Sequence, residues 1–243
     1  PIFYDGGHTM SFGNKIIAEN VFSVISPIYF GQTYSVIHSD LQTGNNEPET
    51  GIVYAVGANF SGKNFDNLNL QNAVFDKADL SNTSFKNTII DGARFVFANL
   101  NNSNLLDRTD LSNINLAGTD LSDVSFKGKN LSGIILTGAD LSNTNLSGVD
   151  LSGKDLTGTI LTGADLSGKD LTGTILTGAD LSHTIITNVD LSGKDLTGTI
   201  LIGVDLSGKD LTGTILTGAD LSNTNLAGVD LSNTNLTGVD LSG

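Results

Sequence analysis

The amino-acid sequence predicts an all-β solenoid in which a short unit repeats along most of the chain. A large apolar residue recurs at every fifth position from Phe60 to Leu105 and again from Leu111 to Leu241. The second half consists mainly of Leu, Asp, Gly, Thr, Ser and Asn, and a composition this narrow indicates repeats. A five-residue period fits neither a helical turn nor the alternation of a flat strand. Short extended steps separated by corners account for it.

Each unit keeps the same order of residue types around its apolar centre. The residue two before the centre is small, as at Ala139 and Ala164, and the residue just before the centre is usually Asp or Asn. Ser or Thr follows the centre, and Gly or Asn often comes next. The centre and the small residue both point inward, and a glycine accepts the positive φ of a corner. One extra residue, within the stretch 106–108, interrupts the series.

The blocks A-D-L-S-N and A-D-L-S-G resemble the pentapeptide-repeat family, and about three quarters of the chain carries this pattern. The resemblance implies a right-handed quadrilateral β-helix with four pentapeptides per coil. About nine coils at a rise of about 4.8 Å would make a rod roughly 45 Å long. Closely matching blocks begin at Leu151 and Leu191, and at Leu166 and Leu206, so the surface is expected to repeat every second coil.

Residues 1–50 have a different composition from the repeats. They are rich in Tyr and Phe, contain β-type runs such as NVFSVIS, and end in a polar stretch. We therefore expect a small β-rich head over residues 1–50 that covers the N-terminal end of a solenoid over residues 51–243. Because the sequence begins at Pro1, we expect either a removed leader or a longer parent chain.

Composition excludes several classes of function. The formal net charge is −14, which disfavours nucleic acid and anionic lipid as partners. The absence of cysteine excludes disulfides and thiolate metal sites. No apolar run approaches the roughly 20 residues that cross a bilayer, so we expect no membrane insertion. The three histidines, His8, His38 and His183, lack metal-ligand spacing, and a filled solenoid offers no natural cleft. We therefore expect no cofactor and no enzymatic activity.

A column of aspartates is expected on one face, because residues one coil apart lie above one another. Carboxylate oxygens suit calcium, so the column is a weak candidate for a ladder of divalent cations. The favoured interpretation is that each Asp accepts a hydrogen bond from a nearby backbone N–H at its corner. The candidate residues are Asp150, Asp170, Asp190, Asp210 and Asp230.

Two departures from the repeat pattern concern lysines and isoleucines. The lysines occupy the small inward position; since burial of an unpaired ammonium is costly, we expect their stems to turn outward and to pair with nearby Asp. The isoleucines occupy the outward position, where they either make lateral contacts or cover the lysine stems. The lysines are Lys129, Lys154, Lys169, Lys194 and Lys209, and the isoleucines are Ile135, Ile160, Ile175, Ile185, Ile200 and Ile215.

The last coil is as regular as the others, although solenoids need polar caps for solubility. An uncovered coil is an exposed edge to which another chain can add. We expect the aromatic head of the next copy to cover it. The predicted interface consists of Leu226, Leu231, Leu236 and Leu241 on the coil and Phe3, Tyr4 and Phe12 on the head.

These observations favour a structural protein that assembles head to tail with itself into an extracellular filament or cell-surface structure. The alternative, by analogy with some members of the family, is a cytoplasmic DNA mimic that binds a type II topoisomerase such as gyrase. A net charge of −14 along a rod of roughly 45 Å gives about half the charge per unit length of duplex DNA.

Overall fold

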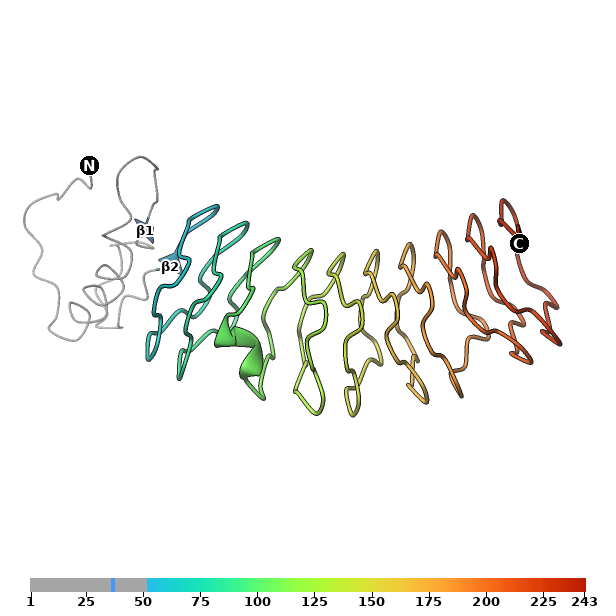
Figure 1. The fold of residues 1–243 in the computed structure, drawn as a ribbon, viewed down its shortest axis with the longest axis horizontal. Helices are drawn as coiled ribbons and strands as arrows, with labels where there is room; N and C mark the ends of the chain where they lie inside the picture. Colours follow the sequence, from blue (N-terminus) through green and yellow to red (C-terminus); the bar gives the residue numbers. More distant parts are fainter. Residues whose placement is uncertain (1–35, 38–51) are drawn as a thin grey trace, which may run out of the picture.

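The computed structural model describes residues 36–37 and 52–243, and most of this length forms one elongated solenoid (Figure 1). Strand β1 (Val36–Ile37) pairs antiparallel with strand β2 (Ile52–Val53) at the start of the rod. The short 3-10 helix η2 (Asn104–Asp107) interrupts the coils about a quarter of the way along the rod (Figure 1). Apart from β1, the predicted head at residues 1–50 lies outside the described residues.

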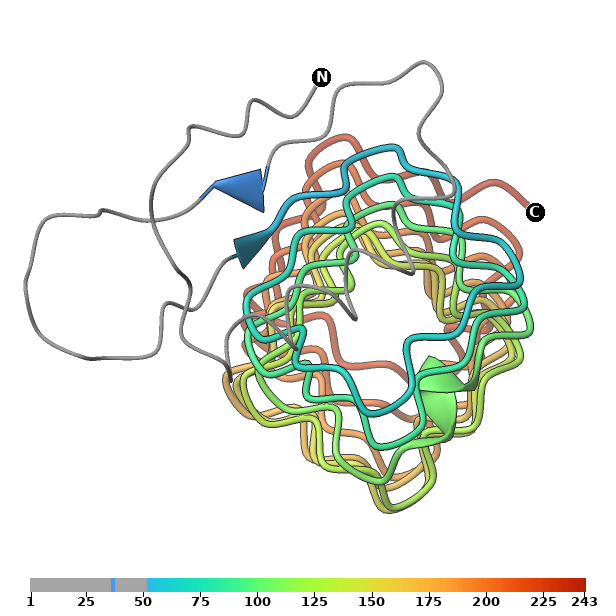
Figure 2. The same cartoon turned by 90° about the vertical axis from the view of Figure 1, so that its left-hand side faces the viewer.

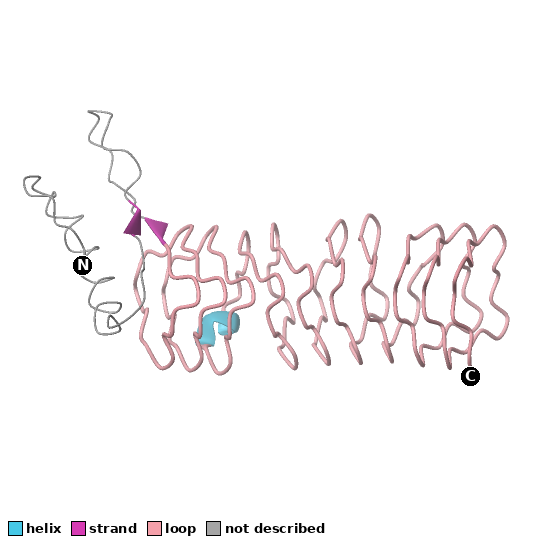
Figure 3. Cartoon of the chain, turned by 90° about the horizontal axis from the view of Figure 1, so that it is seen from above, coloured by secondary structure: helices cyan, strands magenta, loops and turns pink. Residues whose placement is uncertain are grey.

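Parallel bridges join residues that are 20 apart, such as Asn59 to Asp79 and Asp79 to Asn99. A coil therefore contains four pentapeptides, and the view along the rod shows coils stacked around one axis (Figure 2). This arrangement confirms the expected right-handed quadrilateral β-helix. Because each side contributes only a single bridged residue, most of the solenoid is drawn as turns and loops (Figure 3). No helix in the described part of the chain is long and apolar enough to cross a membrane.

Most corners are tight turns closed by a backbone hydrogen bond, as where the Ala139 N–H donates to the Leu136 carbonyl at 2.9 Å. The corner residue has a positive φ, for example 66° at Gly178 and 55° at Asn143. Gly adopts this conformation at no steric cost, and Asn tolerates it better than most residues. The predicted role of the Gly positions is therefore confirmed, and Asn takes the same conformation at other corners.

The apolar centres fill the axis of the solenoid, and the small residues two positions earlier pack between them. Phenylalanines fill the first coils, where Phe65 stacks on Phe85 at 5.0 Å and Phe75 stacks on Phe95 at 5.5 Å between ring centroids. Leucine fills most of the axis after η2. A residue at a given position therefore contacts its equivalents one coil away.

We name the four faces by their outward residues in one coil: face 1 carries Asp170, face 2 Ile175, face 3 Asp180 and face 4 Ile185. Face 3 has an uninterrupted series of bridges from Asp120 to Asp240. On faces 1, 2 and 4, some pairs of adjacent coils in this part of the rod are not joined by a bridge. Face 3 is therefore the continuous hydrogen-bonded side of the C-terminal half.

Candidate functional site

The leucines predicted for the coil side of the assembly interface become more exposed toward residue 243. Leu221 is 2% exposed, whereas Leu236 is 38% and Leu241 is 56% exposed. Leu226 and Leu231 are partly buried against the core. These leucines are thus more exposed than those of the preceding coils, and assembly through them stays a prediction. The proposed covering residues Phe3, Tyr4 and Phe12 lie outside the described residues.

The outward isoleucines form a checkerboard with aspartates on faces 2 and 3. On face 2, Asp155 and Asp195 alternate with isoleucines, and on face 3 the order is shifted by one coil. The isoleucines are 38–52% exposed except Ile200, which is less exposed. The members are Ile135, Ile175 and Ile215 on face 2 and Ile160 and Ile200 on face 3, while Ile185 lies on face 4. A carboxylate lies between successive isoleucines of a face, so no continuous apolar strip forms, and lateral contact remains a prediction.

The aspartates of face 1 make the contacts expected of corner caps. Asp150 Oδ1 accepts a hydrogen bond from the Ser152 N–H at 2.9 Å and from the Ser152 hydroxyl at 2.7 Å. Asp170 and Asp210 accept the N–H of the residue two positions later at 2.8 Å. Equivalent bonds hold Asp190 and Asp230. Within the described residues, no group of three or more His, Cys, Asp or Glu side chains is placed to hold a metal ion.

These caps predict a loss of stability in acid. The hydroxyl and then the N–H of the following Ser or Thr lower the pKa of Asp150, Asp170, Asp190 and Asp230 below 3.8. A carboxyl whose pKa is lower in the folded state stabilises the fold above its unfolded pKa, and this contribution is lost as the pH falls through the folded value. We expect the melting temperature to be flat from pH 7 to about pH 5 and to fall below pH 3.8.

Asparagine provides the control for this prediction, because an amide oxygen accepts the same bond without titrating. Asn130 Oδ1 already accepts the Ser132 N–H at 3.0 Å. A variant with Asn at all four aspartates should melt at a lower temperature at pH 7, because neutral acceptors make weaker bonds, and should lose less of its melting temperature in acid, as measured by circular dichroism. The same acid sensitivity in both proteins would contradict the assignment to these caps.

The inward lysines donate to backbone carbonyls rather than pairing with aspartates. Lys169 Nζ lies 2.6 Å from the Leu146 carbonyl oxygen and 3.0 Å from that of Val149. Lys129, Lys194 and Lys209 make bonds of the same kind. No ion pair joins any of the five lysines to an aspartate of residues 52–243. The expected pairing was therefore wrong, because the inward stem brings the ammonium to the carbonyls of the coil before it.

These lysines replace part of the backbone ladder. The Asp180 N–H donates to the Thr159 carbonyl at 2.8 Å, whereas in residues 52–243 the Asp170 N–H has no such bond to Val149. The Val149 carbonyl accepts a hydrogen bond from Lys169 Nζ instead. Burial lowers the pKa of Lys169, and the charges of Asp165 and Asp150 oppose this effect. Lys169 and Lys209, which donate to the carbonyls of Val149 and Val189, thus each substitute a side-chain donor for a backbone donor.

A seam crosses the rod at η2, where the extra residue shifts the register. On face 2 the ladder continues, since the N–H groups of Phe95 and Phe97 donate to the carbonyls of Asn115 and Ala117 at 2.7 and 2.9 Å. On faces 1, 3 and 4, no bridge in the described part of the chain joins the coil before the seam to the coil after it. The two segments are therefore held by one backbone ladder out of four.

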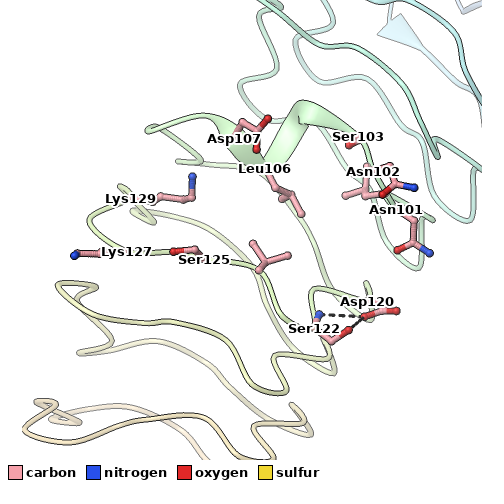
Figure 4. Close-up of a pocket in the computed structure, with 12 residues that line it drawn as sticks. Asn101, Asn102, Ser103, Leu106, Asp107, Asp120, Ser122, Ser125, Lys127 and Lys129 are labelled. Atoms are coloured by element: carbon pink, nitrogen blue, oxygen red, sulfur yellow. Dashed lines mark hydrogen bonds between the residues drawn. The ribbon is translucent and has the colours of Figure 1, made fainter.

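The seam opens into a polar cleft with a volume of about 460 Å³ (Figure 4). The turn before η2 and η2 itself form one wall, and residues 120–129 form the other. The lining residues are Leu100, Asn101, Asn102, Ser103, Leu106, Asp107, Asp120, Ser122, Val124, Ser125, Lys127 and Lys129. This cleft was not among the features predicted from the sequence, although the break in the five-residue period at residues 106–108 was its signal.

Arg108 lies beside the seam and carries a buried Nε that has no hydrogen-bond partner. Its Nη1 donates to the Phe85 carbonyl at 3.4 Å, and its own carbonyl accepts from Lys129 Nζ at 2.9 Å. A buried donor without a partner costs about 1–3 kcal/mol. The extra residue is therefore incompletely accommodated.

The comparisons with known proteins agree with this geometry. A family model described as pentapeptide repeats matches in eight copies, over residues 56–92, 69–107, 105–138, 139–178, 155–193, 174–213 and 210–243. No curated protein matches the sequence significantly.

Solved structures of several pentapeptide-repeat and related proteins are also similar. HetL, involved in heterocyst differentiation regulation in the cyanobacterium Nostoc sp. strain PCC 7120, is 26% identical over 77% of this chain and 86% of its own, with a TM-score of 0.38. A trypsin-treated form of QnrB1, a plasmid-mediated fluoroquinolone resistance protein, is 19% identical over 79% and 91%, with a TM-score of 0.34. Rfr23 from the cyanobacterium Cyanothece 51142 is 28% identical over 55% and 87%, with a TM-score of 0.24.

Proposed function

This chain belongs to the pentapeptide-repeat family, and from that premise we propose that it is a non-enzymatic rod that assembles end to end with copies of itself. Its axis is filled by side chains, so the surfaces available for function are the four faces, the seam and the coil edges. The proposed setting is an extracellular filament or a cell-surface structure. Binding of divalent cations along the aspartate column of face 1 remains a secondary proposal.

The apolar edge of the last coil carries this proposal. Leu231, Leu236 and Leu241 are progressively more exposed, whereas the leucines of the preceding coils are almost fully buried. A coil edge also presents backbone N–H and C=O groups that pair in every stacked coil, and such edges favour the addition of another chain. Burial of apolar surface by the adjoining copy would stabilise the contact by about 25 cal/mol per Å².

Negative-stain electron microscopy and sedimentation velocity at micromolar concentration test the proposal. We expect filaments or a concentration-dependent series of oligomers for the chain. A double variant with Leu236→Asp and Leu241→Asp should sediment as a single rod, because it places charge on the edge. A matched Ile135→Asp variant changes a side position and should still assemble. Single rods for the unmodified chain at all concentrations would refute end-to-end assembly.

The alternative of a DNA mimic rests on the acidic faces alone. Carboxylates on face 1 are engaged at their own corners, and isoleucines interrupt the charge on faces 2 and 3. A mimic of the duplex would need a denser and more continuous array of charge. Inhibition of DNA supercoiling by gyrase, measured with the single-rod variant, would favour the alternative.

A further inference from the structure

The two walls of the seam cleft carry backbone groups that pair elsewhere on face 3. At a regular junction, the Leu121 N–H donates to the Asp140 carbonyl at 2.8 Å and the Asp123 N–H to the Ser142 carbonyl at 2.9 Å. At the seam, the corresponding donors are the N–H groups of Leu100 and Asn102. Neither has a backbone acceptor within residues 52–243.

The opposite wall is unpaired in the same way. In a regular ladder the carbonyls of Asp120 and Ser122 would accept those two N–H groups, and the Asp120 N–H would donate to the Ala98 carbonyl. None of these three bonds forms in the described part of the chain. The cleft is therefore bounded by two strand edges that face each other without pairing, and an unpaired strand edge is a template for another strand.

The size and lining of the cleft suit a short stretch of polypeptide. Its volume of about 460 Å³ lies within the range of ligand sites, roughly 300–1,000 Å³. Leu100, Leu106 and Val124 supply an apolar side, and the rest of the lining is polar. Among the lining residues, two aspartates and two lysines carry formal charges that cancel. Recognition of a strongly charged small ligand is thus disfavoured relative to recognition of a neutral main chain.

We propose that the seam cleft binds an extended peptide segment of another protein by strand addition. The carbonyls of the peptide would accept the N–H groups of Leu100 and Asn102, and its own N–H groups would donate to the carbonyls of Asp120 and Ser122. One aliphatic side chain would face Leu106 and Val124, with small polar residues on either side. Main-chain bonds give such complexes their affinity, and the pocket for the side chain gives specificity. The proposal does not depend on end-to-end assembly.

The test uses a defined peptide that already forms ladders in this fold. The probe is a fluorescein-labelled, N-acetylated and C-amidated peptide with the sequence of residues 138–144, GADLSNT. Fluorescence anisotropy is expected to show saturable binding to the whole chain. An otherwise identical peptide with N-methyl groups at alternate residues lacks the donors and should bind at least tenfold more weakly.

Two protein variants locate the binding. Deletion of Arg108 restores the five-residue register and should close the cleft, while Ser122→Trp leaves the register intact and places a large ring against the cleft. Both should weaken binding at least tenfold. If one of them fails to fold, the other still decides the question. In hydrogen exchange, the amides of Leu100, Asn102 and Asp120 should exchange fast in the free protein and slow down with the peptide.

Three results would overturn the proposal. The first is no binding of the probe up to millimolar concentration, as expected of a cleft that holds only water. The second is equal binding of the N-methylated peptide, which would exclude main-chain pairing. The third is binding unchanged by both protein variants, which would place the peptide at the open edge of the last coil instead of the seam.

Discussion

Deletion of Arg108 is expected to raise the free energy of unfolding by about 2–4 kcal/mol, an unusual result for the removal of a residue. The deletion restores the five-residue spacing between Leu105 and Leu111, so that faces 1, 3 and 4 regain their ladders across the seam. A net gain of about 0.5–1.5 kcal/mol per backbone bond makes three restored bonds on face 3 sufficient. The deletion also removes the buried Nε that lacks a partner. Urea denaturation followed by circular dichroism measures the change.

A deletion at a regular corner is the matched control. Gly158 is a corner residue at the end of face 2, where backbone hydrogen bonds join its coil to the next. Its own N–H donates to the Thr177 carbonyl at 3.0 Å. Removal of Gly158 creates a register break of one residue, in the opposite sense to the break at the seam, and should lower stability. Because a repeat array can unfold in parts, each transition is fitted separately. Equal or lower stability after deletion of Arg108 would show that the open ladders do not weaken the rod.

The second large effect is expected from Phe85→Ala, which should destabilise the N-terminal coils by about 3–5 kcal/mol. Phe85 is 1% exposed and stacks on Phe65 at 5.0 Å with an interplanar angle of 10°. Its ring also meets Phe95 edge to face at 6.2 Å. Removal of the ring leaves a cavity that two flanking coils cannot collapse into without breaking their ladders. The loss should appear first in the hydrogen exchange of residues 60–107.

Ile185→Ala is the control for that substitution, because Ile185 is 52% exposed on face 4. Surface substitutions away from special features usually change stability by less than about 0.5 kcal/mol. The two variants thus remove apolar side chains that differ mainly in burial. A loss below about 1 kcal/mol for Phe85→Ala would mean that the aromatic stack does not hold the first coils together.

The coil, its corners and its core were predictable because every important contact has a fixed offset in the sequence. Phe60 and Leu80 are buried centres at the same position of successive coils, and Gly178 turns a corner with a positive φ, as its residue type indicated. The local cap of Asp150 on Ser152 spans two residues, so its residue pattern is visible in any one repeat. In such a fold the five-residue period alone specifies which residues lie next to one another in adjacent coils.

The acceptors of the lysines and the seam cleft were not predictable in the same way. The bond from Lys169 to Val149 depends on where a carbonyl of the previous coil points, and residue types do not record that direction. The extra residue at 106–108 could equally have formed an outward bulge with the ladders intact. Its accommodation as η2, with three ladders open, depends on contacts between the two segments that residue types do not record.

The checkerboard of faces 2 and 3 limits how a gene for such a rod can change in length. Loss or gain of one coil by unequal recombination would place isoleucines above isoleucines on one of these faces and aspartates above aspartates on the other. Loss or gain of two coils at once, as between the matching blocks at Leu151 and Leu191, restores the alternation and alters only the length. The coding sequence can therefore lengthen or shorten the rod in steps of two coils while the side surface seen by any partner stays the same.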